Sequence, residues 1–313
     1  MSSNAEHTKA FGKLILLGEH FVVYQVPALV GAVAAFTDCQ VEKNSDETSD
    51  LEIVDNRPAV PNYKVQKAEE GEKAIKLVFD HLKISSKGLK LTFGGNLCCA
   101  SGIGASAAQV VSLARALNSE YNLNLSEDQI NQAGYEGEKG YHGTPSGIDN
   151  TAATFAGLLK FQRTDSDPIF IKKKLKEPIR IVYASTGITA STTTVVGDVR
   201  AKKEADPAWF DDLLQQYLQL VSKGEEALDT GDVNTLGSIM NENHILCQKL
   251  TVSCDELDRL VDAARSAGAV GAKMSGTGRG GLMVALTPTV ELQDKVAAEL
   301  EKIAPQVWKT SFQ

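Results

Sequence analysis

The sequence predicts a protein of the α+β class with two domains. The chain has 313 residues, a length that suits one large domain or two moderate ones. In its first part, short apolar runs bounded by glycine alternate with segments of helical periodicity, whereas amphipathic helical patterns dominate the rest. We therefore predict an N-terminal domain over residues 1–180 and a C-terminal domain over residues 181–313.

Apolar composition predicts four strands in or near the N-terminal domain. They are residues 12–18, 89–93, 158–162 and 179–185. The apolar residues of segment 107–117 recur at helical spacing, which places Ser106 near a helix N-terminus. Ser126 and Gln129 form a capping-box pattern, which predicts the start of a second helix running toward Glu138.

Three amphipathic helices are predicted in the C-terminal domain from apolar residues at helical spacing. The first two cover residues 210–221 and 236–246. The third follows Ser253, which forms a capping-box pattern with Glu256. A glycine-rich turn then leads into a strand at residues 282–286, and a last helix is expected around residues 296–303.

The composition is that of a globular protein with more acidic than basic residues. Apolar residues make up 42% of the chain and charged residues 23%. The 40 acidic and 32 basic residues give a formal net charge of −8. Binding to nucleic acid or to an anionic membrane is therefore not expected, because both favour a basic surface. An anion would need a local binding site.

Cysteine usage and the N-terminal residues indicate a reducing compartment. The five cysteines include no C-x-x-C pair, a pattern typical of reduced thiols rather than of disulfides or a zinc site. The apolar stretch 21–36 is interrupted by Gln25 and Pro27 and is too short to span a bilayer. The first residues lack signal-peptide and presequence patterns, so we expect a cytoplasmic protein, with an organelle address read by a receptor left open.

Residues 98–117 contain a glycine-rich loop that fits two known patterns incompletely. Gly102, Gly104 and Ala107 match the dinucleotide fingerprint G-x-G-x-x-G/A. That motif needs a second strand followed by an acidic residue. Glu120 has roughly the right spacing, but a helix and no strand precedes it, so the dinucleotide interpretation is disfavoured.

A phosphate-binding loop agrees better with these residues. The two glycines let the backbone approach an anion, and the following helix supplies free N–H groups and the positive end of its dipole. Ser106, in the first turn, offers its hydroxyl to a phosphate or to Mg²⁺. However, no lysine follows the glycines, and a tight, well-capped strand-to-helix turn explains the loop alone equally well.

Three further segments combine glycine with charged residues; they are residues 12–32, 136–157 and 271–286. In the first, Lys13, Glu19 and His20 flank an apolar strand, a position where charges are usually solvated. In the second, Asp149 lies in a Ser-Gly loop, as in an ordinary Asx turn. The third is a second glycine loop, which a hairpin turn would explain.

The order of these segments along the chain resembles the GHMP family of small-molecule kinases. The segments that carry the resemblance are GKLILLGEHFVVYQVPAL, ASGIGASAA, HGTPSGIDN and KMSGTGRGG. They are most similar to those of family members that phosphorylate mevalonate, and the similarity covers nearly the whole chain. Galactokinases are less similar, because their first motif continues into an Asp-Tyr pair that is absent here.

The resemblance implies a fold and an activity. The implied fold joins an N-terminal domain like domain 2 of ribosomal protein S5 to a ferredoxin-like C-terminal domain, with the active site in the cleft between them. The implied activity is phosphorylation of the 5-hydroxyl of mevalonate by ATP and Mg²⁺, in isoprenoid and sterol precursor biosynthesis. Alternatives are another small alcohol, such as phosphomevalonate, or a non-catalytic ligand-binding regulator. Lys13, Glu138 and Asp149 together argue against a regulator. A homodimer is compatible with the family.

The resemblance also assigns roles to individual residues. Asp149 is the implied catalytic base with Lys13 paired to it, and Ser106 and Glu138 are the implied Mg²⁺ ligands. The implied ATP-binding residues are Ala100, Ser101, Gly102, Ile103, Gly104, Ala105 and Ser106. The implied substrate-binding residues are Lys13, Glu19, His20, Asp149, Thr192 and Thr277.

Three features depart from the family pattern. Ala105 stands where relatives usually have a serine, so one hydroxyl is missing. Arg279 replaces a common glycine and either contacts a phosphate or points to solvent, the option we favour. Gly187 and Ala190 stand where many relatives carry a lysine and an arginine near the substrate. Nearby hydroxyls, backbone N–H groups or His20 would then hold the substrate carboxylate.

Overall fold

The computed structural model describes residues 7–100, 102–166 and 168–312, so the predicted loop residue Ser101 lies outside the described residues. The chain divides into two compact units. The first contains residues 1–13 and 32–156, and the second contains residues 14–31 and 157–313. Strands β1 (Ala10–Leu17) and β2 (Ala28–Lys43) contribute to both units. The units are therefore not consecutive stretches of chain. A single boundary at residue 180, by contrast, divides the chain into two consecutive stretches.

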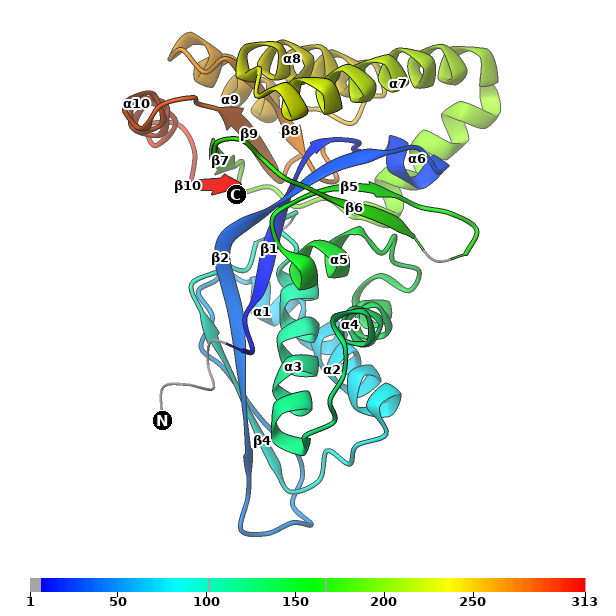
Figure 1. Cartoon of the computed structure of the whole chain (residues 1–313), viewed down its shortest axis with the longest axis vertical. Helices are drawn as coiled ribbons and strands as arrows, with labels where there is room; N and C mark the ends of the chain where they lie inside the picture. The colour runs from blue at the N-terminus through cyan, green and yellow to red at the C-terminus, as the bar shows by residue number, and fades with distance from the viewer. Residues whose placement is uncertain (1–6, 101, 167, 313) are drawn as a thin grey trace. The chain divides into compact units, whose positions relative to one another are not determined.

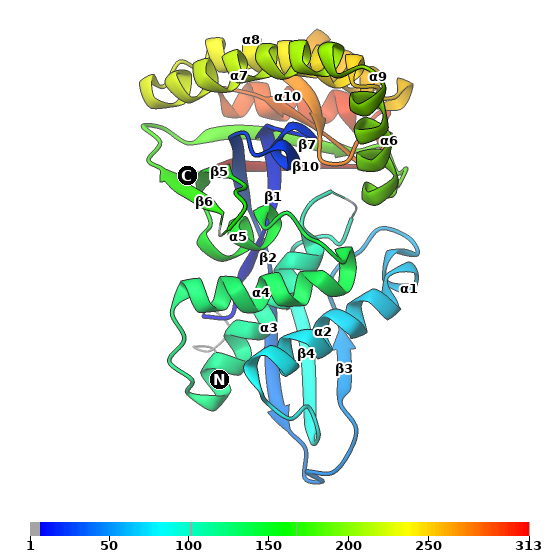
Figure 2. The same ribbon diagram turned by 90° about the vertical axis from the view of Figure 1, so that its right-hand side faces the viewer.

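The first unit places three long helices on one face of a sheet (Figures 1 and 2). In the sheet, β4 (Leu89–Gly95) pairs in parallel with β3 (Glu52–Asp55) and in antiparallel with residues 37–43 of β2. The helices of this unit are α1 (Tyr63–Gln66), α2 (Ala68–Leu82), α3 (Ala105–Tyr121), α4 (Glu127–His142) and α5 (Ile148–Phe155). Helix α3 is buried around most of its circumference because it packs against α2, α4 and α5.

Two glycines let α4 lie unusually close to its neighbours. A Cβ atom added to Gly137 would come within 2.7 Å of side-chain atoms of Val110 on α3 and of Val78 on α2. One added to Gly140 would lie well under 3.0 Å from the backbone of Ala74 on α2. This close packing is possible because glycine has no Cβ atom at these two positions. It fixes the position of α4, which carries one of the predicted site residues.

The second unit contains a four-stranded antiparallel sheet in the order β10-β7-β9-β8. Its strands are β7 (Ile179–Ser185), β8 (Gly271–Ser275), β9 (Leu282–Leu286) and β10 (Gln306–Phe312). Helices α8 (Val233–Lys249), α9 (Asp255–Ser266) and α10 (Val290–Leu300) pack on this sheet, and α7 (Pro207–Thr230) lies beside α8 (Figures 1 and 2).

The same unit includes a smaller group of strands, formed by residues near the start and in the middle of the chain. Residues 28–31 of β2 pair with β5 (Leu158–Gln162), which in turn pairs with β6 (Ile169–Lys173). The short 3-10 helix η1 (Phe21–Tyr24) joins β1 to β2, and α6 (Thr192–Ala205) precedes α7. Among the described residues, no helix combines the length and the apolar character needed to cross a bilayer.

The strands predicted from apolar composition are all confirmed, as are the helices over segments 107–117, 210–221 and 236–246. The capping box at the start of α4 is also confirmed, since the side chains of Ser126 and Gln129 each bond the other's backbone N–H. A four-residue pattern succeeds here because both partners belong to the same turn and no other group competes for them.

Two details of the C-terminal helices were predicted wrongly. Helix α9 begins after Cys254, not after Ser253, because the Ser253 hydroxyl donates its hydrogen bond to Asp258 and does not cap the helix. The last helix starts six residues before the predicted start at 296, because the Thr289 hydroxyl accepts a hydrogen bond from the N–H of Leu292 and caps it there. The first start was predicted from a capping pattern whose serine is bonded elsewhere, and the second from apolar spacing, which does not register the cap at Thr289.

Candidate active site

The glycine-rich loop leads directly into helix α3. Gly102 and Gly104 have φ values of 89° and 75°, a region that favours glycine. Gly104 is the N-cap residue of α3 and has no side chain with which to cap the helix. The N–H groups of the first turn therefore have no capping side chain from this residue and can serve an anion.

An ion pair lies beside this loop. The Nζ atom of Lys13 on β1 is 3.2 Å from Oδ1 of Asp149, the second residue of α5. Lys13 is almost fully buried, whereas the Asp149 side chain keeps 29% of its surface exposed. A Cβ atom on Gly104 would lie 3.1 Å from Cγ of Lys13 and 3.4 Å from Oδ1 of Asp149, so the loop passes close to the pair. The N–H of Lys13 also donates to the carbonyl of Ile103 at 2.7 Å. The fold therefore brings a lysine to a loop that has none.

Glu138 and Ser106 form a second polar group in the same unit. Both are buried, with Glu138 on α4 and Ser106 in the first turn of α3. Burial and, to a smaller extent, the nearby charge of Asp149 raise the pKa of Glu138, whereas a hydrogen bond with Ser106 and the charge of Lys13 lower it; the net result is a pKa of about 8.

The donor set of this group fits a hard cation. Among the described residues, Oε1 of Glu138 is buried without a hydrogen-bond partner, and Oε2 is 3.7 Å from Nε2 of His142. A buried carboxylate oxygen without a partner is costly unless a donor or a cation approaches it. In the part of the chain that the structure describes, no three His, Cys, Asp or Glu side chains gather to hold a metal. A cation here would take its remaining ligands from phosphate and water, as Mg²⁺ commonly does.

The second unit brings together three of the predicted substrate residues. Nε2 of His20 lies 2.7 Å from the carbonyl oxygen of Thr277, and the hydroxyls of Thr192 and Thr277 are 2.6 Å apart. His20 is 7% exposed, and its Nδ1 has no hydrogen-bond partner among the described residues. Its φ of 61° is unfavourable for a residue with a side chain, and such strain is concentrated at functional positions. His20, Thr192 and Thr277 therefore form a polar cluster.

The protonation of His20 follows from these contacts. Burial lowers its pKa below the ordinary value of 6.5, and the hydrogen bond to Thr277 opposes this shift only in part. The imidazole is therefore neutral at neutral pH. Because a carbonyl oxygen can only accept, Nε2 carries the proton and Nδ1 is left as an acceptor.

Glu19 is held by a residue that sequence reasoning missed. Lys273 on β8 donates to Oε1 of Glu19 and, at 2.7 Å, to the carbonyl of Met274. Both side chains of this ion pair are fully buried. The sequence carries one signal for this residue: Lys273 is a single lysine next to apolar residues of a strand, and a buried lysine needs a charged partner.

The departures from the family pattern also have definite positions. Arg279 forms an ion pair with Asp198 and donates from Nε to the carbonyl of Thr251 at 3.2 Å. Its side chain is 34% exposed and has partners within this unit. The solvent-exposed position that we favoured for Arg279 is therefore wrong. Gly187 is exposed, and Ala190 directly precedes the N-cap of α6.

The glycine loop at a helix N-terminus, the lysine–aspartate pair and the buried glutamate are what a phosphotransferase needs. A family model described as the GHMP kinases N terminal domain matches residues 70–157, and one described as GHMP kinases C terminal matches residues 225–306. The chain belongs to the GHMP kinase family, and it has the two-domain fold of that family.

The proteins to which this chain is similar include mevalonate kinases. The mevalonate kinase of Thermococcus gammatolerans is 31% identical over 310 residues, covering 92% of this chain and 90% of that protein. The crystal structure of L. major mevalonate kinase in complex with R-mevalonate superposes with a TM-score of 0.94 at 43% identity, covering 98% of this chain and 95% of the other. The mevalonate kinase structure from Methanococcus jannaschii has a TM-score of 0.80 at 24% identity and covers 97% of both chains, which shows the shared fold.

Proposed function

We propose that this protein transfers the γ-phosphoryl group of ATP to the 5-hydroxyl of mevalonate. The single observation that carries the proposal is the ion pair of Lys13 and Asp149 beside the glycine loop, in a chain that belongs to the GHMP kinases and is similar to mevalonate kinases. A protein that merely binds a nucleotide needs no catalytic base, so the Asp149 carboxylate beside the loop favours an enzyme over a regulator.

The first unit supplies the groups for the chemical step. The N–H groups at the start of α3 bind the triphosphate, and the glycines let the backbone reach it. Asp149 accepts the proton of the 5-hydroxyl as the new bond from that oxygen to the γ-phosphorus forms. The bond from the γ-phosphorus to the bridging oxygen breaks, and ADP leaves. Lys13 stabilises the negative charge on the attacking oxygen and on the γ-phosphate.

Ser106 and Glu138 are the residues that would hold Mg²⁺. Bound there, Mg²⁺ would neutralise charge on the β- and γ-phosphate oxygens. The partnerless Oε1 of Glu138 supports this assignment. Ionised Glu138 is required for such binding, and its raised pKa means that cation and proton compete for the carboxylate near neutral pH.

In the second unit, His20, Thr192 and Thr277 are proposed to contact mevalonate. Since Nδ1 of His20 is an acceptor, it suits a hydroxyl of the substrate better than its carboxylate. Because the hydroxyls of Thr192 and Thr277 bond each other, one of them keeps a proton that can be donated to a carboxylate, which would compensate in part for the lysine and arginine missing at positions 187 and 190. The product would serve isoprenoid and sterol precursor synthesis.

A coupled assay of ADP formation tests the proposal. Mg·ATP is supplied with mevalonate, phosphomevalonate, galactose or homoserine, and turnover is expected with mevalonate only. Asp149→Ala should lower kcat by about a thousandfold or more and keep ATP affinity, because it removes a group that acts in the transition state. Asp211→Ala, at an exposed position of α7, is the matched control and should keep the wild-type rate.

Each outcome of this assay has a definite meaning. A rate near wild type in Asp149→Ala would show that the base is another residue. Turnover with phosphomevalonate alone would reject the substrate and keep the reaction class. Binding of ATP without turnover of any alcohol would indicate a regulator on a kinase fold.

A further inference from the structure

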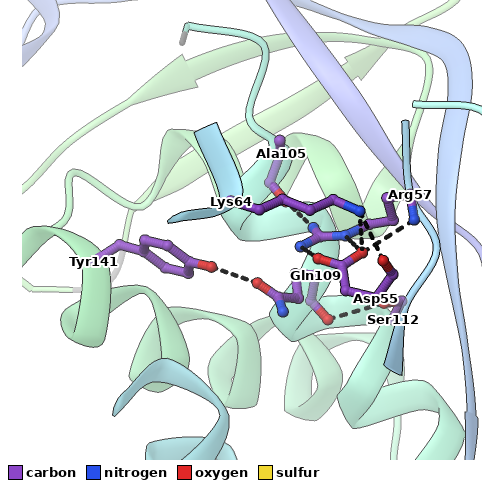
Figure 3. A network of polar contacts seen from close by, with 7 residues as sticks. All are labelled: Asp55, Arg57, Lys64, Ala105, Gln109, Ser112 and Tyr141. Atoms are coloured by element: carbon purple, nitrogen blue, oxygen red, sulfur yellow. Dashed lines mark hydrogen bonds and ion pairs between the residues drawn. The ribbon is translucent and has the colours of Figure 1, made fainter. Parts of the chain in front are cut away.

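Arg57 is buried behind the phosphate loop and belongs to none of the motifs that identify the family. Its side chain is only 5% exposed. Nε and Nη2 of the guanidinium donate to the two carboxylate oxygens of Asp55, at 2.9 and 2.7 Å (Figure 3). The guanidinium carbon also lies 5.6 Å from the centre of the Phe93 ring. This two-point contact and the ring hold the plane of the guanidinium in one orientation.

A second cation orients the same carboxylate. Nζ of Lys64 donates to the backbone carbonyl of Asp55 at 2.7 Å and lies 3.3 Å from Oδ1 of its side chain (Figure 3). One carboxylate therefore faces two cations, which leaves one positive charge in excess in this cluster. Asp55 is the last residue of β3, so the cluster is anchored to the sheet.

The third arm of Arg57 reaches the phosphate loop. Its Nη1 donates to the carbonyl oxygen of Ala105 at 3.2 Å. Ala105 is the first residue of α3. Because a peptide unit is planar, holding the carbonyl of Ala105 also fixes the direction of the N–H of Ser106, which belongs to the same unit. Arg57 therefore helps to hold one of the N–H groups at the helix N-terminus in its direction.

The residues after Arg57 hold the other end of the same loop. The N–H of Cys99 donates to the carbonyl of Pro58 at 2.7 Å, and the N–H of Val60 donates to the carbonyl of Cys99 at 3.0 Å. Segment 57–60 thus contacts the loop at both ends, at Cys99 and at Ala105. Such double support is what a loop needs to present its N–H groups to a ligand without reorganising.

We propose that Arg57 is a positioning residue for ATP: oriented by Asp55, its guanidinium holds the carbonyl of Ala105 and so aims the N–H of Ser106 at the triphosphate. This inference rests on the proposed role of the loop in binding ATP. The role requires a fork, because one side chain must reach both Asp55 and Ala105. The three donors of lysine share one nitrogen atom, so lysine cannot keep the two-point contact with Asp55 and reach Ala105 at the same time.

The same part of the structure provides a matched control. The Tyr141 hydroxyl donates to the side-chain oxygen of Gln109 on α3, and the Ser112 hydroxyl donates to the backbone carbonyl of Gln109 at 2.9 Å (Figure 3). Tyr141→Phe removes a buried hydrogen bond to α3 one turn beyond Ala105. It leaves the contact of Arg57 intact, so it separates a loss of stability from a loss of alignment.

The experiment measures Mg·ATP binding by calorimetry and steady-state kinetics on the full chain for wild type, Arg57→Ala, Arg57→Lys and Tyr141→Phe. Loss of a hydrogen bond from a charged donor corresponds to about 10- to 100-fold in affinity. We therefore expect both Arg57 variants to weaken ATP binding and raise KM for ATP by at least about tenfold, with little change in KM for mevalonate. Millimolar guanidinium should restore part of the ATP affinity of Arg57→Ala. Tyr141→Phe should keep KM for ATP even if its melting temperature falls.

Hydrogen exchange adds a readout that does not depend on turnover. In Arg57→Ala, the backbone amides of residues 102–106 should exchange faster than in wild type, and those at the far end of α3 should not. Wild-type KM for ATP in Arg57→Ala, full function of Arg57→Lys, or an equal KM increase in Tyr141→Phe would each overturn the inference. If wild type binds ATP but does not phosphorylate mevalonate, the substrate proposal fails and the binding data still decide this one. If wild type binds no ATP, both fail.

Discussion

The buried carboxyl of Glu138 makes the stability of the first unit depend on pH. Its pKa in the folded protein is about 8, against an ordinary value of 4.5 in the unfolded chain. Between these two values, the folded state binds the proton and the unfolded state does not. The free energy of unfolding must therefore fall as pH rises from about 4.5 to about 8. Glu138→Gln cannot ionise and should abolish this fall.

The size of the effect follows from the same values. Each pKa unit corresponds to about 1.4 kcal/mol of differential stability. The full interval from 4.5 to about 8 corresponds to on the order of 5 kcal/mol, part of which arises from the charge of Asp149 and depends on that residue as well. We therefore expect Glu138→Gln to gain about 2–5 kcal/mol over wild type between pH 5 and pH 8.5.

The assay must report on the first unit. Both tryptophans, Trp209 and Trp308, belong to the second unit, so their fluorescence reports on unfolding of the second unit and not of the first. Hydrogen exchange of α3 and α4, measured from pH 5 to pH 8.5 with EDTA and without nucleotide and corrected for the intrinsic rate, gives the local free energy of opening. Glu72→Gln makes the same charge change at an exposed position of α2 and serves as the control.

The expected result is a stability difference between Glu138→Gln and wild type that grows with pH, and no such growth for Glu72→Gln. A difference that stays constant over this range, or that grows as pH falls, would refute the assignment of a raised pKa. Adding Mg·ATP should reduce the pH dependence of wild type, because a cation at Glu138 favours the ionised form.

Two further predictions concern stability alone. Lys273→Met removes the Lys273 partner of the buried Glu19 carboxylate and should destabilise the second unit by about 3–5 kcal/mol, measured by urea unfolding followed by tryptophan fluorescence. The double variant with Glu19→Gln should regain part of this loss. A double variant as unstable as Lys273→Met would contradict the pairing. Gly140→Ala forces a methyl group against the backbone of Ala74 and should lower the free energy of unfolding by about 1–3 kcal/mol. Gly197→Ala, where a Cβ atom would meet nothing within 4 Å, should stabilise α6 by about 0.5–1 kcal/mol. Equal effects at the two positions would show that close packing of α4 is not what requires glycine.

The predicted site residues were recognised by order and resemblance, and local chemistry alone did not distinguish them. The glycine loop by itself fitted a tight turn as well as a phosphate site. The structure adds that Lys13 and Asp149, far apart in the sequence, form an ion pair beside Gly104. Their catalytic roles stay predictions, to be tested by the assay above.

Other parts of the site had no signal that sequence reasoning could use. Arg57 and Asp55 are separated by one residue and look like an ordinary charged pair at a strand end. The role proposed for Arg57 depends on its contact with the carbonyl of Ala105, a residue 48 positions away in the sequence, so this contact exists only in the folded unit. Lys273 is likewise a single lysine in a strand when only the sequence is considered, and its contact with Glu19 comes from the fold.

The sequence by itself determined the secondary structure wherever the signal is local. Apolar periodicity placed most strands and helices, and the capping box at Ser126 began α4 correctly, because each depends on residues within a few positions of one another. Local patterns failed at two helix starts: Ser253 bonds Asp258 and does not cap α9, and Thr289 caps α10 before the apolar spacing begins.

Only the tertiary structure decided the charges and contacts of the site. The pKa of Glu138 depends on burial by other helices and on the charge of Asp149, and the acceptor state of His20 Nδ1 depends on the carbonyl of Thr277. These properties arise from neighbours that are distant in sequence, so no local pattern encodes them. Packing sets the local dielectric and the hydrogen-bond partners, and these set the chemistry of each residue.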